Sequence, residues 1–407
     1  MSKWKYKKGM EDDDLPTYQK MRKTKKSKSG TDPLEPFEKP LEKWKEEKQK
    51  GSFTARVVEV HKKYSFVCRE DDIGHIDMHD VWLATIARKF LTQSRVERNL
   101  VTVGDVVICQ PAKDTEDLDS EESDLPRCVI ENMIPRKSRI ARKDPMTPGR
   151  EHVIASNIDQ LLIVASYFNP KIRWGLIDRF LVLAEENEIP VILVFTKKDL
   201  LPEIKNERFL TEIQEQEQLY RSLGYKVISL STLKGQDNGK EISELESILN
   251  NKISIVGGHS GVGKSSLVNI FNPEIEQEVE ENPNIFYKGR HTTTYASFLS
   301  LGTGGYVIDT PGVRSFLLLE EHDAINLSHY FIEFKEHRAK CKFRECKHVD
   351  EPGCAVIEAV NNGSINRRRY RSYLSLLSGE SSREGRAAIK EPELVGNEEA
   401  DWGEYID

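Results

Sequence analysis

A glycine-rich stretch over residues 258–265 has the composition and spacing of a phosphate-binding loop. It reads Gly-His-Ser-Gly-Val-Gly-Lys-Ser and fits G-x-x-x-x-G-K-[ST], between an apolar run and helix-forming residues. Glycines let consecutive backbone N–H groups surround phosphate oxygens, Lys264 supplies positive charge, and the Ser265 hydroxyl can ligate Mg²⁺. The following helix opens with its positive dipole end toward the anion. The expected contacts of a nucleoside triphosphate here are Gly258, His259, Ser260, Gly261, Val262, Gly263, Lys264, Ser265 and Ser266.

Residues 196–199, Thr-Lys-Lys-Asp, follow another apolar run and resemble the base-reading element of GTP-binding proteins. A carboxylate such as that of Asp199 can accept hydrogen bonds from both the ring N–H and the exocyclic amine of guanine, and adenine offers neither in that geometry. Thr196 replaces the commoner Asn, which shortens one tether of this loop and puts guanine affinity in question. The expected base-side residues are Thr196, Lys197, Lys198, Asp199 and Ser231.

Asp309 ends a third apolar run and is followed by Thr-Pro-Gly, the pattern of a carboxylate that holds Mg²⁺ beside the γ-phosphate. We expect magnesium to be held by Ser265, Thr292, Thr293 and Asp309, although spacing does not decide which threonine of residues 292–294 reaches the ion.

The catalytic residues expected are His291, Lys264 and Asp309. Val313 stands where many GTPases carry a glutamine that orients the attacking water, and an isopropyl group cannot do so. Our hypothesis is that His291 orients or deprotonates this water once RNA fixes its loop. The alternative is that His291 is a surface or RNA-contacting residue.

The surrounding pattern alternates apolar strands with amphipathic helices, which predicts a mostly parallel sheet with the site at its carboxyl edge. The strands are expected near residues 158–165, 191–195, 225–230, 253–257 and 306–308, and the helices near 177–187, 207–223 and 242–250. The base-reading segment precedes the phosphate loop, whereas ordinary GTPases have the reverse order. The sequence therefore predicts a circularly permuted GTPase domain.

Four residues late in the chain, Cys341, Cys346, His348 and Cys354, form the ligand set of a closed, tetrahedral structural Zn²⁺ site. The alternative is a small core of reduced cysteines. After them, residues 365–377 predict a helix with a basic face, either for a phosphate backbone or for solvent.

Short β-type runs before the GTPase segment, at 53–60, 64–69, 101–110 and 127–134, predict a small barrel of the oligonucleotide-binding type, or a plain β-domain without a ligand. The basic start of the chain indicates either a solvated, disordered segment or an arm for nucleic acid or another acidic surface, and the acidic end is typical of a disordered segment. The expected division is a basic arm (1–50), an OB-like, RNA-binding β-barrel (51–137), an α/β circularly permuted P-loop GTPase domain (138–322), a small zinc-binding helical domain (323–378) and an acidic tail (379–407).

At 407 residues and 38% hydrophobic content, the chain has no apolar run long enough for a membrane helix and no signal-peptide core after Met1, so the cytoplasm is expected.

Together the segments GHSGVGKSSL, GRHTTT, DTPGVR and IDQLLIV and the cysteine–histidine finger resemble the RsgA family, formerly YjeQ, of small-ribosomal-subunit biogenesis GTPases. The resemblance covers residues 51–377 and implies that barrel and finger contact ribosomal RNA of the small subunit. It also implies that the subunit stimulates hydrolysis of GTP to GDP, which drives release late in maturation. The chain is expected to act as a monomer. The rivals are an RNA-binding scaffold for which GTP only sets affinity, and a GTPase acting on a non-ribosomal RNA or protein.

Overall fold

The computed structural model describes residues 51–61, 63–71, 74–87, 100–112, 125–143, 151–233, 239–272, 297–302, 304–309 and 324–378. The arm and tail expected at residues 1–50 and 379–407 lie outside these residues.

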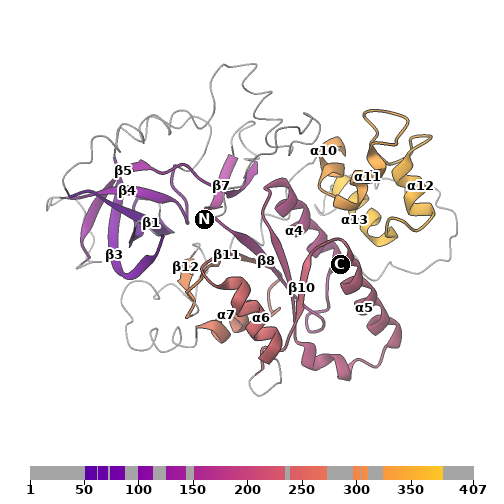
Figure 1. Cartoon of the computed structure of the whole chain (residues 1–407), viewed down its shortest axis with the longest axis horizontal. Coiled ribbons are helices and arrows are strands. Elements are labelled where there is room, and N and C mark those ends of the chain that lie inside the picture. Colours follow the sequence, from indigo (N-terminus) through magenta and orange to yellow (C-terminus); the bar gives the residue numbers. More distant parts are fainter. Residues whose placement is uncertain are drawn as a thin grey trace.

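Five strands form a closed barrel at one end of the molecule (Figure 1). Around the barrel they follow the order β1 (Phe53–Val60), β2 (Ser65–Glu70), β3 (Ile76–Ile86), β5 (Arg127–Met133) and β4 (Val106–Pro111). Alternate residues such as Ala55, Val57 and Val67 fill the interior, as the period of two along a strand requires. The predicted barrel is confirmed. Sequence reasoning missed β3, because Asp77, His79 and Asp80 interrupt its apolar pattern.

A two-stranded hairpin, β6 (Arg139–Lys143) with β7 (Glu151–Ser156), connects the barrel to the next domain. The hairpin is attached to the barrel through Asp105, whose carboxylate has no exposed surface. Asp105 accepts hydrogen bonds from Arg136 Nε at 2.7 Å and Ser156 Oγ at 2.6 Å. A buried carboxylate is tolerated only when such donors replace water, so this contact fixes the junction.

Six strands form the sheet of the second domain in the order β10 (Lys226–Ser229), β9 (Val191–Thr196), β8 (Gln160–Ser166), β11 (Ile253–Gly257), β13 (Tyr306–Asp309) and β12 (Ser297–Ser300). All neighbours are parallel except β12 and β13. The short helix η2 (Lys198–Glu203) directly follows β9. The strand and helix predictions for this domain agree with the structure to within a few residues at each end.

Helices cover both faces of this sheet (Figure 1). One core contains side chains of α4 (Trp174–Glu186) and α5 (Glu207–Ser222) packed on the sheet. The other core contains side chains of α6 (Gly239–Leu249) and α7 (Lys264–Phe271). Because β8 is buried along its whole length, its residues between Gln160 and Ser166 form the continuous apolar run that predicts a central parallel strand.

The C-terminal unit consists of short helices around a separate core. These are α10 (Ala324–His329), η3 (Ile332–Phe334), α11 (Lys335–Arg338), α12 (Ala355–Asn361) and α13 (Arg367–Ser378). Its core includes Phe331, Phe334 and Tyr373, and Val182 of α4 belongs to the same cluster. The finger therefore packs directly on the GTPase domain.

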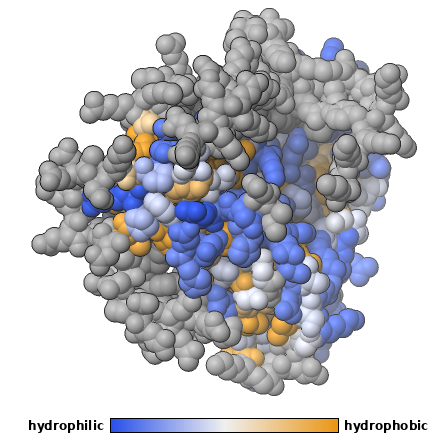
Figure 2. Space-filling model, turned by 60° about the vertical axis from the view of Figure 1, so that its left-hand side comes forward, coloured by the Kyte–Doolittle hydropathy of each residue, from blue (hydrophilic) through white to orange (hydrophobic). Residues whose placement is uncertain are grey.

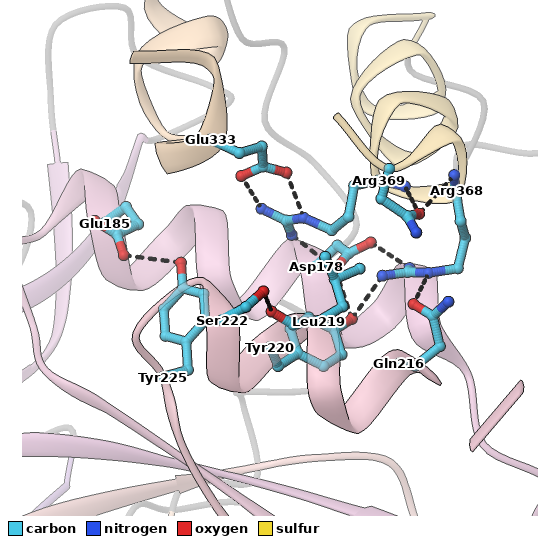
Figure 3. Close-up of polar contacts among 11 residues, drawn as sticks. Asp178, Glu185, Gln216, Leu219, Tyr220, Ser222, Tyr225, Glu333, Arg368 and Arg369 are labelled. Carbon is cyan, nitrogen blue, oxygen red and sulfur yellow. Dashed lines mark hydrogen bonds and ion pairs between the residues drawn. The ribbon is translucent and has the colours of Figure 1, made fainter. Parts of the chain in front are cut away.

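Two arginines of α13, the fully buried Arg369 and the largely buried Arg368, point into this junction instead of facing RNA or solvent (Figure 3). Arg368 and Arg369 donate to the two oxygens of Asp178 on α4 at 2.6 and 2.7 Å. Arg369 also contacts Glu333 at 2.7 Å. Both readings of the basic helix face were therefore wrong for these two arginines, because helical spacing alone does not reveal a buried carboxylate on another helix. The pair makes a rigid link between the domains.

Replacing Asp178 with Asn is expected to destabilise this junction by about 3–5 kcal/mol, because two buried guanidinium groups lose their charge partner. Burial opposes ionisation of Asp178, but Arg368 and Arg369 outweigh it and lower its pKa to about 2. The carboxylate's stabilisation is therefore fully present above about pH 4, where the unfolded group is ionised, and is lost as the pH falls toward 2.

Denaturant unfolding of the full chain measures this cost. Lys226→Gln is a matched control, since its ion pair with Glu244 lies at the surface and is worth less than about 1 kcal/mol. Equal effects of the two substitutions would contradict a buried structural role for Asp178.

Within the part of the chain that the structure describes, no helix combines the length and apolarity needed to cross a membrane. On the face shown in Figure 2, hydrophilic residues cover most of the described surface and hydrophobic residues form small separate patches.

Candidate nucleotide and zinc sites

The predicted phosphate loop connects β11 to α7, which begins at Lys264. Gly258 has φ +148°, and a Cβ there would lie 2.1 Å from the carbonyl oxygen of Val164, so only glycine fits. Lys264 Nζ donates to the carbonyl oxygens of Gly258 and His259 at 2.9 and 2.7 Å, across the loop. Ser265 and Ser266 lie in the first turn of α7. The loop therefore places its lysine over its own backbone, where phosphate oxygens bind in this motif.

Thr196 connects the base-reading segment to the phosphate loop. Its side chain is fully buried, and its Oγ1 donates to the carbonyl oxygen of Val262 at 2.5 Å and lies 3.3 Å from that of Ala165. The hydroxyl has one proton to donate, and the shorter contact identifies Val262 as its acceptor. Threonine at this position thus supplies a tether between the two loops in place of the commoner asparagine.

The carboxylate of Asp199 is positioned by Ser231. Asp199 lies in the first turn of η2, and its Oδ1 accepts a hydrogen bond from Ser231 Oγ. The backbone N–H of Lys198 donates to the carbonyl oxygen of Leu230 at 3.2 Å, which joins the same two segments again. Lys197 has a left-handed backbone with φ 58°, and its Nζ contacts the carbonyl oxygen of Asn169. The structure therefore brings Thr196, Lys197, Asp199 and Ser231 together.

Asp309 lies at the carboxyl end of β13, where its Cα is paired with that of Val256 on β11. Because β11 leads directly into the phosphate loop, the carboxylate and the loop belong to neighbouring strand ends. The carboxyl ends of β9, β8, β11 and β13 meet at one edge of the sheet, which is where α/β sheets bind ligands. The predicted residues His291, Thr292 and Thr293, like Val313, lie outside the described residues.

Sequence reasoning missed the segment between β8 and α4. A hollow beside the phosphate loop is lined by Ser166, Pro170, Arg173, Gly258 and His259, among others. Pro170 also approaches Gly261, since a Cβ on that glycine would lie 3.6 Å from the proline ring. The rule that strand ends of a parallel sheet share one edge could have identified this segment, because it directly follows a predicted strand.

The four predicted metal ligands converge in the C-terminal unit. The ligand atoms of Cys341, Cys346, His348 and Cys354 all lie within 4.8 Å of one another. The Sγ atoms of Cys341 and Cys354 are 4.0 Å apart, and His348 Nδ1 lies 3.6 and 3.4 Å from them. A tetrahedral Zn²⁺ site requires separations of about 3.8 Å between sulfurs and about 3.5 Å from nitrogen to sulfur. The cluster has the dimensions of such a site.

The surroundings of this cluster also fit a bound cation with three thiolates. Burial lowers the pKa of His348 to about 4, which keeps its imidazole in the neutral, ligating form. Burial raises the pKa of Cys346, so its deprotonation needs a neighbouring cation. Arg338 has a buried Nη1 without a hydrogen-bond partner among the described residues. Its positive charge would balance the net negative charge of Zn²⁺ with three thiolates.

Two tyrosines of α13 hold the backbone of the finger at residues 347 and 348. Tyr370 Oη donates to the carbonyl oxygen of His348 at 2.7 Å, and Tyr373 Oη donates to that of Lys347 at 2.6 Å. His348 has a left-handed backbone with φ 59°, uncommon for a residue with a side chain. The hydrogen bond from Tyr370 to the carbonyl oxygen of His348 helps to hold that conformation.

A parallel sheet that gathers these loops at one edge, in an order rotated along the chain, defines a circularly permuted P-loop GTPase with a barrel before it and a finger after it. Residues 133–319 match the family described as RsgA GTPase. The chain is 38% identical over 295 residues to the "Small ribosomal subunit biogenesis GTPase RsgA" of Flavobacterium psychrophilum, covering 72% of this chain and 85% of that protein. The chain therefore belongs to the RsgA GTPase family and is a GTPase.

Two solved structures agree with this assignment. The YjeQ structure from Thermotoga maritima matches with a TM-score of 0.59 and 33% identity, covering 82% of this chain and 100% of that one. YloQ, described as a circularly permuted GTPase, matches with a TM-score of 0.57 and 26% identity, covering 83% of this chain and 97% of that one. The expected resemblance and the permuted fold are confirmed.

Proposed function

We propose that this chain binds the small ribosomal subunit and hydrolyses GTP to GDP and phosphate during late subunit maturation. In this proposal the subunit stimulates hydrolysis, and hydrolysis is coupled to release of the chain. The observation that carries the proposal is the contact of Thr196 with Val262, because it joins the base-reading segment to the phosphate loop. The name of the Flavobacterium relative supports the small subunit as partner.

In this site Asp199 reads guanine while Ser231 holds its carboxylate, and Thr196, Lys197 and Lys198 complete the base side. The loop backbone and Lys264 hold the β- and γ-phosphates, which neutralises charge that develops during phosphoryl transfer. The proposed magnesium residues are Ser265, Thr292, Thr293 and Asp309. Bound Mg²⁺ would neutralise phosphate charge. Cys341, Cys346, His348 and Cys354 would hold a structural Zn²⁺, with no position left for a substrate.

We further propose that the barrel, residues 51–137, and the zinc domain, residues 323–378, flank a GTPase domain of residues 138–322 and contact ribosomal RNA. The chain would act as a monomer in the cytoplasm. Support for the RNA role comes from the closed barrel, an architecture that binds oligonucleotides in many proteins, and from exposed cations on the finger.

Co-sedimentation with purified small subunits tests the proposal. The chain should pellet with subunits in a non-hydrolysable GTP analogue and remain in solution with GDP. Phosphate release should rise when subunits are added to GTP. Binding without any stimulation would favour the rival scaffold, for which GTP only sets affinity. Failure to pellet would favour a partner other than the ribosome.

His291→Ala tests the proposed water-orienting residue. If this histidine acts as a general base or orients the water, its loss should lower subunit-stimulated turnover by about 10²- to 10⁴-fold. Nucleotide binding and co-sedimentation should be unchanged. His259→Ala is a comparison within the phosphate loop: it removes another imidazole, whose Nδ1 lies 2.8 Å from the carbonyl oxygen of Ser260, and shows whether loss of any imidazole at the site has the same effect. Wild-type stimulated turnover of His291→Ala would remove that residue from catalysis.

A further inference from the structure

The finger presents a rigid, exposed turn, residues 340–347, here called the knuckle. Its ends are fixed because Cys341 and Cys346 both belong to the metal-ligand cluster. The backbone N–H of Lys342 donates to the carbonyl oxygen of Gly353 at 3.2 Å. The backbone N–H of Lys347 donates to the carboxylate of Glu351 at 2.6 Å. The knuckle is therefore ordered before any partner arrives, which lowers the entropic cost of binding.

An aromatic ring stands on this turn in an unusual setting. The finger buries Phe331 and Phe334 completely, yet leaves Phe343 45% exposed. Lys342 Nζ lies 5.7 Å from the centre of the Phe343 ring. A single exposed phenylalanine is unremarkable by itself. Here the ring is held on a turn whose other exposed residues are nearly all charged. The charges beside the ring therefore indicate the chemistry of its binding partner.

Cations flank this ring along the chain. The knuckle carries four cations and one carboxylate, and all five side chains are exposed: Lys340, Lys342, Arg344, Lys347 and Glu345. The nearby carboxylate of Glu351 is already engaged by the backbone N–H groups of Lys347 and Val349. The knuckle thus combines a flat apolar ring with an excess of positive charge.

We infer that the knuckle is a stacking site for one unpaired RNA base, which lies on Phe343 while the adjoining phosphates contact the lysines and Arg344. An aromatic ring beside cations fits the two parts of a single-stranded nucleotide, its base and its phosphate. Paired bases inside a duplex are stacked on one another, so their faces are not available to Phe343. A duplex would therefore contact only the cations of the knuckle, through its phosphates. An acidic peptide would likewise leave the ring unused. The choice of RNA rests on the proposed function.

Binding of the full-length, zinc-loaded chain to a fluorescein-labelled ten-nucleotide single-stranded RNA tests this inference. Phe343→Ala should weaken binding about 5- to 150-fold, the range for loss of one stacked base. Phe343→Trp should bind as wild type, whereas Phe343→Leu, which keeps apolar area but has no ring, should behave like the alanine variant. Phe168→Ala, which removes a ring that is 47% exposed outside the finger, should bind as wild type.

The same RNA annealed to its complement separates stacking from charge. Duplex affinity should not depend on Phe343, and Arg344→Gln should reduce the salt dependence of single-strand binding by about 0.7 in the log–log slope. Wild-type single-strand affinity for Phe343→Ala, or for Phe343→Leu, would overturn the inference. Co-sedimentation of the wild type with small subunits separates failure of the stacking site from failure of the proposed ribosomal role. If the wild type pellets while Phe343 has no effect, the stacking site fails and the ribosomal role stands.

Discussion

Asp199→Asn is expected to exchange guanine specificity for xanthine specificity. The carboxylate can accept two hydrogen bonds from guanine, and each charge-assisted bond contributes about 1.5–3 kcal/mol, so GTP hydrolysis should fall by about 10²- to 10⁴-fold. Xanthine carries a carbonyl where guanine carries its amine, and the introduced amide can donate to it. XTP should then become the better substrate. The amide oxygen also preserves an acceptor for Ser231, which bonds Asp199 in the native chain.

Phosphate release from GTP and XTP at matched concentrations measures this exchange. Glu203→Gln provides the control, because it neutralises another carboxylate of η2 that is exposed. This control should keep GTP as its substrate. Asp199→Asn hydrolysing GTP within a few-fold of wild type, without gaining XTP, would contradict the assigned base contact.

Removal of zinc is expected to unfold the C-terminal unit while the GTPase domain stays folded. A structural zinc site of this kind contributes about 10–16 kcal/mol of apparent binding free energy, far more than the small core of residues 324–378 can replace. Cys346→Ser, or a strong chelator, should therefore abolish protection of α12 and α13 against amide hydrogen exchange. Nucleotide binding should persist, because the nucleotide site belongs to a separate core.

Cys68→Ala serves as the matched control, since this buried thiol lies in the barrel and away from the metal-ligand cluster. It should retain one zinc per chain and full protection of α13. Unchanged exchange of α12 and α13 after complete loss of zinc would favour the alternative of a small core of reduced cysteines.

Local patterns predicted most of the fold. Strands buried on both sides, such as β8 and β9, have continuous apolar runs, and the phosphate loop is specified by its own spacing. The ligand set of the finger could be read from four residues for the same reason. Each of these signals is contained within a few consecutive residues, so no knowledge of distant contacts is needed.

Contacts between distant elements could not be predicted. The partners Asp178 and Arg369 are separated by 191 positions, and a helix with several arginines looks the same whether they face solvent or a buried carboxylate. The contact of Thr196 with Val262 spans 66 positions. The sequence alone predicts that this threonine shortens a tether of the loop. Its hydroxyl makes the connection only because β9 and β11, the two neighbours of β8, bring the two loops together at the carboxyl edge of the sheet.

The central claim is that guanine recognition and phosphate binding belong to one pocket at the carboxyl edge of the sheet. Determining the structure of the chain with a non-hydrolysable GTP analogue and Mg²⁺ tests it most directly. We predict that the guanine ring N–H and amine lie within hydrogen-bond distance of Asp199. In the same structure Lys264 Nζ should have left the carbonyl oxygens of Gly258 and His259 for the β- and γ-phosphates. A bound analogue whose base lies out of reach of Asp199, or whose phosphates leave Lys264 on those carbonyls, would contradict the account.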